Sequence, residues 1–76
     1  MELRQRIIDF WLAEYKRTRW PFISRVQITL ALDTNIDDTI REMRRDKQVI
    51  LRHGLNDILV VYAGDQQILN EVKQYL

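Results

Sequence analysis

Guanidinium groups recur over a short stretch of the chain, at Arg41, Arg44 and Arg45. An arginine side chain presents its N–H groups as a fork that can bind a guanine edge or a phosphate. Asp38 and Glu42 interrupt this stretch. A carboxylate is repelled by phosphate, although it can accept a hydrogen bond from cytosine. The stretch could therefore recognise nucleic acid, or its charges could pair with one another on a solvated or protein-binding helix.

The sequence gives little support for a catalytic site or a metal site. The chain contains one histidine, His53, one serine, Ser24, and no cysteine. A Ser-His-Asp arrangement would need both residues, yet Ser24 is better explained as a helix cap. One histidine with scattered carboxylates is not a metal site, and Gly54 and Gly64 do not make a phosphate-binding loop. We therefore expect no enzyme activity, catalytic residue, metal, cofactor or small-molecule substrate.

The composition is that of one globular domain. The chain has 76 residues, of which 46% are hydrophobic and 30% charged. The net charge is only +1, so a DNA-binding surface would need its positive charge clustered. No apolar run approaches the roughly 20 residues that span a bilayer, and the start of the chain does not resemble a signal peptide. We expect no membrane partner and a cytoplasmic protein, in the host cytoplasm if the chain is viral.

The spacing of apolar residues predicts the elements that position these groups. Helices are expected over residues 2 to about 17, 25 to about 32, 36 to about 47 and 66 to 76. Strands are expected at 22–23, 48–53 and 58–62, with a glycine-containing hairpin connection between the last two.

Several short polar residues are predicted to cap the helices. Ser24 and Asp65 precede the second and the last helix. The third helix is capped either by Thr34, in a box with Asp37, or by Asn35. Apolar positions expected to face the core include Ile28, Ala31, Leu32, Ile36, Ile40, Met43, Ile68, Leu69, Val72, Tyr75 and Leu76. We also expect the aromatic residues to pack in the core rather than to stack on bases, namely Phe10, Trp11, Tyr15, Trp20 and Phe22.

The second and third predicted helices are separated by about three residues, as in a helix-turn-helix pair. From residue 23 to 62 the chain resembles a winged helix-turn-helix domain. The resemblance is carried by Ile28-Thr29-Leu30-Ala31-Leu32, the Asp33-Thr34-Asn35 turn, Ile36, Ile40, Met43, the Arg44-Arg45-Asp46-Lys47 stretch and the hairpin at 49–62. Winged-helix sequences usually carry glycine before the first wing strand, where this chain has Lys47 or Gln48. They often carry glycine or another small residue at the turn, where this chain has Asp33.

The resemblance implies an α+β fold and a single domain over residues 1–76. Its helix-turn-helix would span about 25–47, its two-stranded wing about 48–62 and an additional C-terminal helix about 66–76. In this family the third helix enters the major groove of double-stranded DNA and the wing contacts the backbone. The residues expected to bind DNA are Arg41, Arg44, Arg45, Asp38, Arg25, Arg52, His53 and Asn56. Alternatively, Asp37–Arg41 and Glu42–Arg45 are ordinary ion pairs on a helix surface.

Two functions follow from this reading. The first is a small regulator of phage, viral or mobile-element origin that binds double-stranded DNA, sequence-specifically or generally. The second is a protein-interaction or assembly adaptor. Phe10 and Leu12 widen the apolar face of the first helix, which either serves two faces of one core or forms a homodimer interface. The candidate interface residues are Leu3, Phe10 and Leu12. Leu55, at the expected wing tip, either folds back onto the core or contacts a partner.

Overall fold

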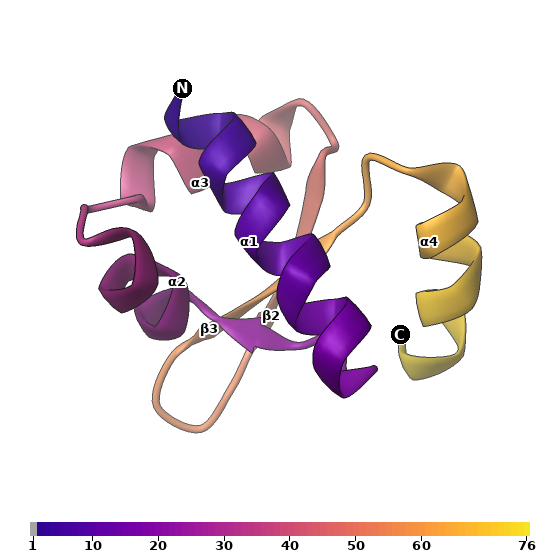
Figure 1. Cartoon of the computed structure of the whole chain (residues 1–76). Helices are drawn as coiled ribbons and strands as arrows, with labels where there is room; N and C mark the ends of the chain where they lie inside the picture. The colour runs from indigo at the N-terminus through magenta and orange to yellow at the C-terminus, as the bar shows by residue number, and fades with distance from the viewer. Residues whose placement is uncertain (1) are drawn as a thin grey trace.

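A computed structural model describes residues 2–76 (Figure 1). The expected elements are present in the expected order, with boundaries shifted by a few residues. They are α1 (Leu3–Thr18), β1 (Ile23–Ser24), α2 (Arg25–Leu32), α3 (Asp37–Arg45), β2 (Val49–His53), β3 (Ile58–Tyr62), α4 (Gln66–Val72) and a final 3-10 turn, η1 (Lys73–Tyr75). The fold is therefore α+β.

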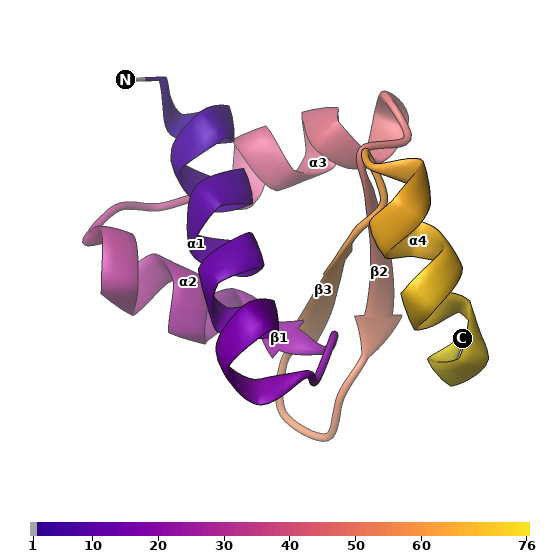
Figure 2. The same ribbon diagram turned by 45° about the vertical axis from the view of Figure 1, so that its right-hand side comes forward.

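The three strands form one antiparallel sheet in the order β1-β3-β2. β2 and β3 are paired along their whole length, from Val49 opposite Tyr62 to His53 opposite Ile58. The two-residue β1 adds to the other edge of β3, with Ile23 opposite Val60. The first strand thus begins one residue later than expected. The hairpin stands between α2 on one side and α4 on the other (Figure 2).

Trp11 is the central residue of the core. Its side chain is completely buried, and its indole N–H donates to the carbonyl oxygens of Val60 at 2.8 Å and Pro21 at 3.2 Å. Its ring stacks on the Tyr15 ring with centroids 5.1 Å apart. The Tyr15 hydroxyl in turn donates to Glu71 of α4 at 2.8 Å. These contacts join α1 to the centre of the sheet and to α4.

The wide apolar face of α1 packs against this core. Leu3, Phe10 and Leu12 are partly buried and contact the core cluster. α1 touches α2, α3 and β3, so one helix does serve two faces of a single core. Use of these three residues in a homodimer stays a prediction.

Several residues expected inside the protein are exposed. Trp20 is 53% exposed, and it packs edge-on against Phe22 and Tyr75, with ring centroids 5.4 and 5.6 Å away. Tyr75 and Leu76 are exposed because α4 ends at Val72 and the tighter η1 turn changes the direction in which later side chains point. Ala31 is exposed as well, so the predicted inner face of α2 was too wide.

The predicted caps are largely correct. Ser24 Oγ accepts from the backbone N–H of Gln27 at 3.0 Å, and Asp65 caps α4 in the same way. The Thr34 capping box was wrong. Asn35 Oδ1 instead accepts from the N–H of Asp37 at 2.9 Å, so α3 begins one residue later than expected.

α3 also ends earlier than expected, because Lys47 adopts a left-handed conformation with φ of 61°. The Lys47 N–H donates to the carbonyl of Arg44, and the Gln48 N–H donates to the carbonyl of Met43. This pair of bonds is the Schellman motif, in which glycine usually holds the left-handed position. Lys47 is one of the positions at which this chain departs from the winged-helix pattern. Asp33, the other, is likewise left-handed, with φ of 52°.

Replacing Lys47 with glycine should therefore stabilise the protein. Glycine takes the left-handed conformation without the steric cost that a Cβ imposes, about 1 kcal/mol. We expect the free energy of unfolding in urea to rise by about 0.5–1 kcal/mol. Lys47→Ala is the matched control, since it removes the same charge but keeps the Cβ. A glycine variant no more stable than the alanine variant would contradict this account.

No helix within residues 2–76 combines the length and the apolar character needed to cross a membrane.

Candidate nucleic-acid interface

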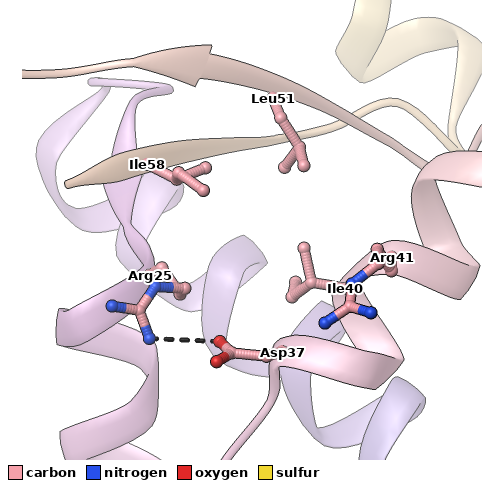
Figure 3. A pocket seen from close by; sticks show the side chains of 6 residues that line it. All are labelled: Arg25, Asp37, Ile40, Arg41, Leu51 and Ile58. Carbon is pink, nitrogen blue, oxygen red and sulfur yellow. Dashed lines mark hydrogen bonds and ion pairs between the residues drawn. The ribbon is translucent and has the colours of Figure 1, made fainter.

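Two adjoining hollows lie between α3 and the β2–β3 hairpin, and they share Leu51 and Ile58 as apolar lining. In the first, Arg25 of α2 and Arg41 of α3 stand on opposite sides below these two strand residues (Figure 3). We call the two hollows together the basic groove. Its lining residues are Arg25, Asp37, Ile40, Arg41, Leu51 and Ile58 in the first hollow, and Arg44, Leu51, Arg52, His53 and Ile58 in the second.

The local sequence explains why cations border this groove. Ile40 and Met43 are buried and fix the rotation of α3 about its axis. Arg41 and Arg44 each follow one of these buried residues, which places them on the helix flank beside the hairpin. Arg25 is the first residue of α2, immediately after the Ser24 cap.

Within the first hollow, Arg25 joins three elements. Its Nη1 lies 3.1 Å from Asp37 Oδ1 at the start of α3, and its Nε lies 3.2 Å from Asp57 Oδ1 beside β3. The second oxygen of Asp57 accepts from the backbone N–H of Val26 at 2.8 Å. The Asp57 carboxylate therefore caps α2 from the hairpin, and the charge of Arg25 is shared between two carboxylates.

Asp57 is held in its ionised form by these contacts. Partial burial by itself would raise the pKa of Asp57. Hydrogen bonds from the N–H groups of Val26 and Ile58, together with the Arg25 charge, outweigh burial and leave the pKa below its ordinary value. An ionised carboxylate is also favoured at a helix N-terminus.

This lowered pKa makes the stability of the fold depend on pH. Because the folded state favours the carboxylate, the contribution of Asp57 is complete well above its ordinary pKa of about 3.9 and is lost as pH falls through the folded-state pKa. We expect Asp57→Asn to lower the free energy of unfolding at pH 7 by about 1–2 kcal/mol. The difference from the wild type should shrink between about pH 5 and pH 3.

Urea unfolding at several pH values measures this effect. Asp9→Asn, at an exposed carboxylate on α1, is the matched control and should unfold like the wild type. A deficit in Asp57→Asn that stayed constant down to pH 3 would show that lost packing, not lost charge, was responsible.

The outward face of α3 carries ion pairs, although not the expected ones. Arg41 lies 3.3 Å from Asp38, whose side chain is 92% exposed. Arg45 lies 3.8 Å from Asp46. The expected Asp37–Arg41 pair was wrong, because Asp37 contacts Arg25 instead.

The expected Glu42–Arg45 pair was also wrong. Arg4 of α1 reaches across to α3 and lies 3.8 Å from Glu42 and 3.1 Å from Asp46. Arg4, which is only 28% exposed, therefore links α1 to α3. Because Arg4 pairs with Glu42, Arg45 does not, and the Arg45 side chain is 74% exposed at the surface. Asp38 and Arg45 thus lie on the outer face of α3, outside the lining of the basic groove.

The second hollow differs from the first, because no carboxylate lines it. Among residues 2–76, no acidic side chain lies within ion-pair distance of Arg44, Arg52 or His53. The Arg52 guanidinium contacts only the carbonyl of Leu51, at 3.4 Å. All three cationic or ionisable side chains are exposed. This half of the groove presents unpaired N–H donors to solvent.

The remaining predicted residues are distributed as follows. Asn56 is exposed at the hairpin tip, and Leu55 beside it is fully exposed rather than folded back onto the core. Arg17 and Arg19, two further cations near the end of α1, pair with Glu14 and Glu71 and do not line the groove.

Sequence reasoning missed the role of Asp57. It is the last residue of the predicted hairpin connection, and nothing in its local sequence shows that it caps a helix that begins 32 residues earlier in the chain, at Arg25. Within the described residues, no group of three His, Asp or Glu side chains is placed to hold a metal ion. Comparisons with protein-family models, with curated proteins and with solved structures found no match to this chain.

Proposed function

We propose that the protein binds double-stranded DNA through the basic groove, as a winged-helix domain. The observation that carries this proposal is the second hollow, where Arg44, Arg52 and His53 meet without a carboxylate. Unpaired guanidinium groups on two adjacent elements suit phosphates and guanine edges. The element order and the β1-β3-β2 sheet order support the winged-helix assignment. α2 and α3 then form the helix-turn-helix, and the β2–β3 hairpin is the wing.

In this proposal the two cationic elements have different roles. α3 lies in the major groove, where Arg41, Arg44 and Arg45 face phosphates and base edges and Asp38 can accept from cytosine. Arg52 and His53 of the wing contact the adjacent backbone. Such a domain acts by binding alone, as a small regulator of the DNA that it occupies.

Fluorescence anisotropy with a labelled mixed-sequence duplex tests the proposal. We expect micromolar binding at about 50 mM salt that weakens steeply by about 200 mM, because each neutralised phosphate releases counterions. Binding that is absent at the lower salt concentration would overturn it.

A second candidate, a protein-interaction module, is favoured by one observation. Trp20, Tyr75 and Leu76 are 53%, 40% and 42% exposed, and Trp20 contacts Tyr75. Contiguous exposed aromatic residues are frequent at protein interfaces. Sedimentation equilibrium with the wild type and with Trp20→Ser tests whether this surface joins two copies. A monomeric wild type would remove the homodimer and leave only a different protein partner.

A further inference from the structure

Arg25 lines the basic groove, yet its guanidinium is already engaged by two carboxylates. Its Nη1 lies 3.1 Å from Asp37 Oδ1 (Figure 3), and its Nε lies 3.2 Å from Asp57 Oδ1. The Arg25 side chain is 30% exposed and that of Asp57 only 15%. Arg44 and Arg52 have no carboxylate within ion-pair distance among residues 2–76. Arg25 would therefore have to break two ion pairs to bind a phosphate, whereas the other two arginines would break none.

The end of the β2–β3 hairpin, residues 52–58, is attached to the helices at one place. β1 pairs with β3 only as far as Leu59. Within the described part of the chain, the side-chain hydrogen bonds and ion pairs that join residues 52–58 to a helix all come from Asp57. Its carboxylate contacts Arg25 and accepts from the Val26 N–H. The position of the hairpin end therefore depends on the two bonds that Asp57 makes to α2.

The position of α3, by contrast, is fixed by packing. Ile40 and Met43 are buried in the core, so α3 keeps its place without an ion pair. Asp37 is the first residue of α3, and its contact with Arg25 joins this fixed helix to the residue that holds the hairpin end. One guanidinium thus connects α3, α2 and the hairpin, and the spacing between α3 and the hairpin end depends on it.

We propose that Arg25 is a positioning residue, which holds the end of the hairpin at a fixed distance from α3 and does not itself contact phosphate. This inference rests on the proposed function. With the spacing fixed, Arg52 on the hairpin is in place to meet the DNA backbone when Arg44 on α3 is bound. A preorganised surface loses less conformational entropy on binding than a mobile one. The two carboxylates that hold Arg25 therefore strengthen DNA binding, although they carry the same sign of charge as phosphate.

Replacing Asp37 with asparagine tests the sign of this effect. A carboxylate that acted on DNA through its charge alone would repel phosphate, so its removal would tighten binding. Because Asp37 holds Arg25, we expect Asp37→Asn to weaken duplex binding about threefold at about 50 mM salt, measured by fluorescence anisotropy. Asp9→Asn is the matched control, because it removes an exposed carboxylate of α1 outside the groove and should bind like the wild type. Unchanged or tighter binding by Asp37→Asn would overturn the positioning role.

Arg25→Lys separates the charge of Arg25 from its shape. A lysine ammonium keeps the charge but lacks the planar fork that fixes two carboxylates in set directions. We expect Arg25→Lys alone to weaken binding about fivefold. Arg52→Ala should cost about tenfold in the wild-type background but only about twofold in the Arg25→Lys background. Arg44→Ala should cost about tenfold in both backgrounds, because α3 stays in place.

This pattern distinguishes positioning from a loss of stability, which would not single out the hairpin arginine. Urea unfolding of each variant verifies that it is folded under the conditions of the binding assay. Equal costs of Arg52→Ala in the two backgrounds, or a cost of Arg44→Ala that falls as far, would overturn the positioning role and leave DNA binding itself intact. Failure of the wild type to bind the duplex would overturn the DNA-binding proposal as well.

Discussion

Replacing Arg44 and Arg52 together with alanine is expected to weaken binding to duplex DNA about 100-fold. Each arginine that contacts a base or phosphate contributes about 1–3 kcal/mol, and about 1.4 kcal/mol corresponds to a tenfold change in affinity. These two side chains line the hollow that no carboxylate borders, so neither has an ion pair to break before it meets a phosphate, and Arg52 gives up only a 3.4 Å bond to the carbonyl of Leu51. Both are exposed, and their removal should leave the fold intact.

The salt dependence of binding adds a second readout. Removing two phosphate contacts should reduce the slope of log affinity against log salt by about two. Titrations by fluorescence anisotropy at several salt concentrations give both the affinity and this slope.

A matched variant separates local contact from overall charge. Arg17→Ala with Arg19→Ala removes the same two charges outside the groove, at side chains that pair with Glu14 and Glu71. We expect its affinity to change much less than that of the groove variant. Equal losses in the two double variants would mean that only the net charge of the protein matters, and the basic groove would lose its assigned role.

Replacing Trp11 with alanine is expected to lower the free energy of unfolding by about 4 kcal/mol. The side chain is wholly buried, and a cavity would open between α1 and the sheet. Its N–H is also a donor to the carbonyls of Pro21 and Val60. Total stability for a chain of this length is about 4–11 kcal/mol, so the variant should be marginally folded at best.

Two further variants make this test specific. Trp11→Phe keeps most of the volume but removes the donor, and we expect it to cost about 2 kcal/mol. Trp20→Ala, at the exposed tryptophan, should cost less than about 1.5 kcal/mol, mainly through its lost aromatic contacts. Urea unfolding monitored by far-ultraviolet circular dichroism measures all three. If Trp20→Ala lowered the free energy of unfolding as much as Trp11→Ala, Trp11 would not be the central residue of the core.

The elements themselves were predictable because each is specified by neighbouring residues. The ladder of apolar residues in α1, the Ser24 and Asp65 caps and the β-branched strands all act over a few positions in the chain. The cationic side chains of α3 and the hairpin were equally visible in the sequence.

Ion-pair partners were not predictable. The sequence suggested Asp37–Arg41 and Glu42–Arg45, but Asp37 contacts Arg25 and Glu42 contacts Arg4. Exposed pairs within one helix are worth only about 0.5 kcal/mol, so a partly buried arginine from another element can displace them. These ion pairs between distant residues determine which arginines have no carboxylate partner. They therefore determine which part of the groove is cationic.

By itself, the sequence determined the order of the elements, their approximate ends and the face that each buries, because hydrophobic periodicity and capping are local. Only the tertiary structure decided that Asp57 would cap α2 and that Arg44, Arg52 and His53 would meet without a carboxylate. The physical reason is that these arrangements depend on contacts between residues far apart in the chain, and those contacts form when the helices pack against the sheet.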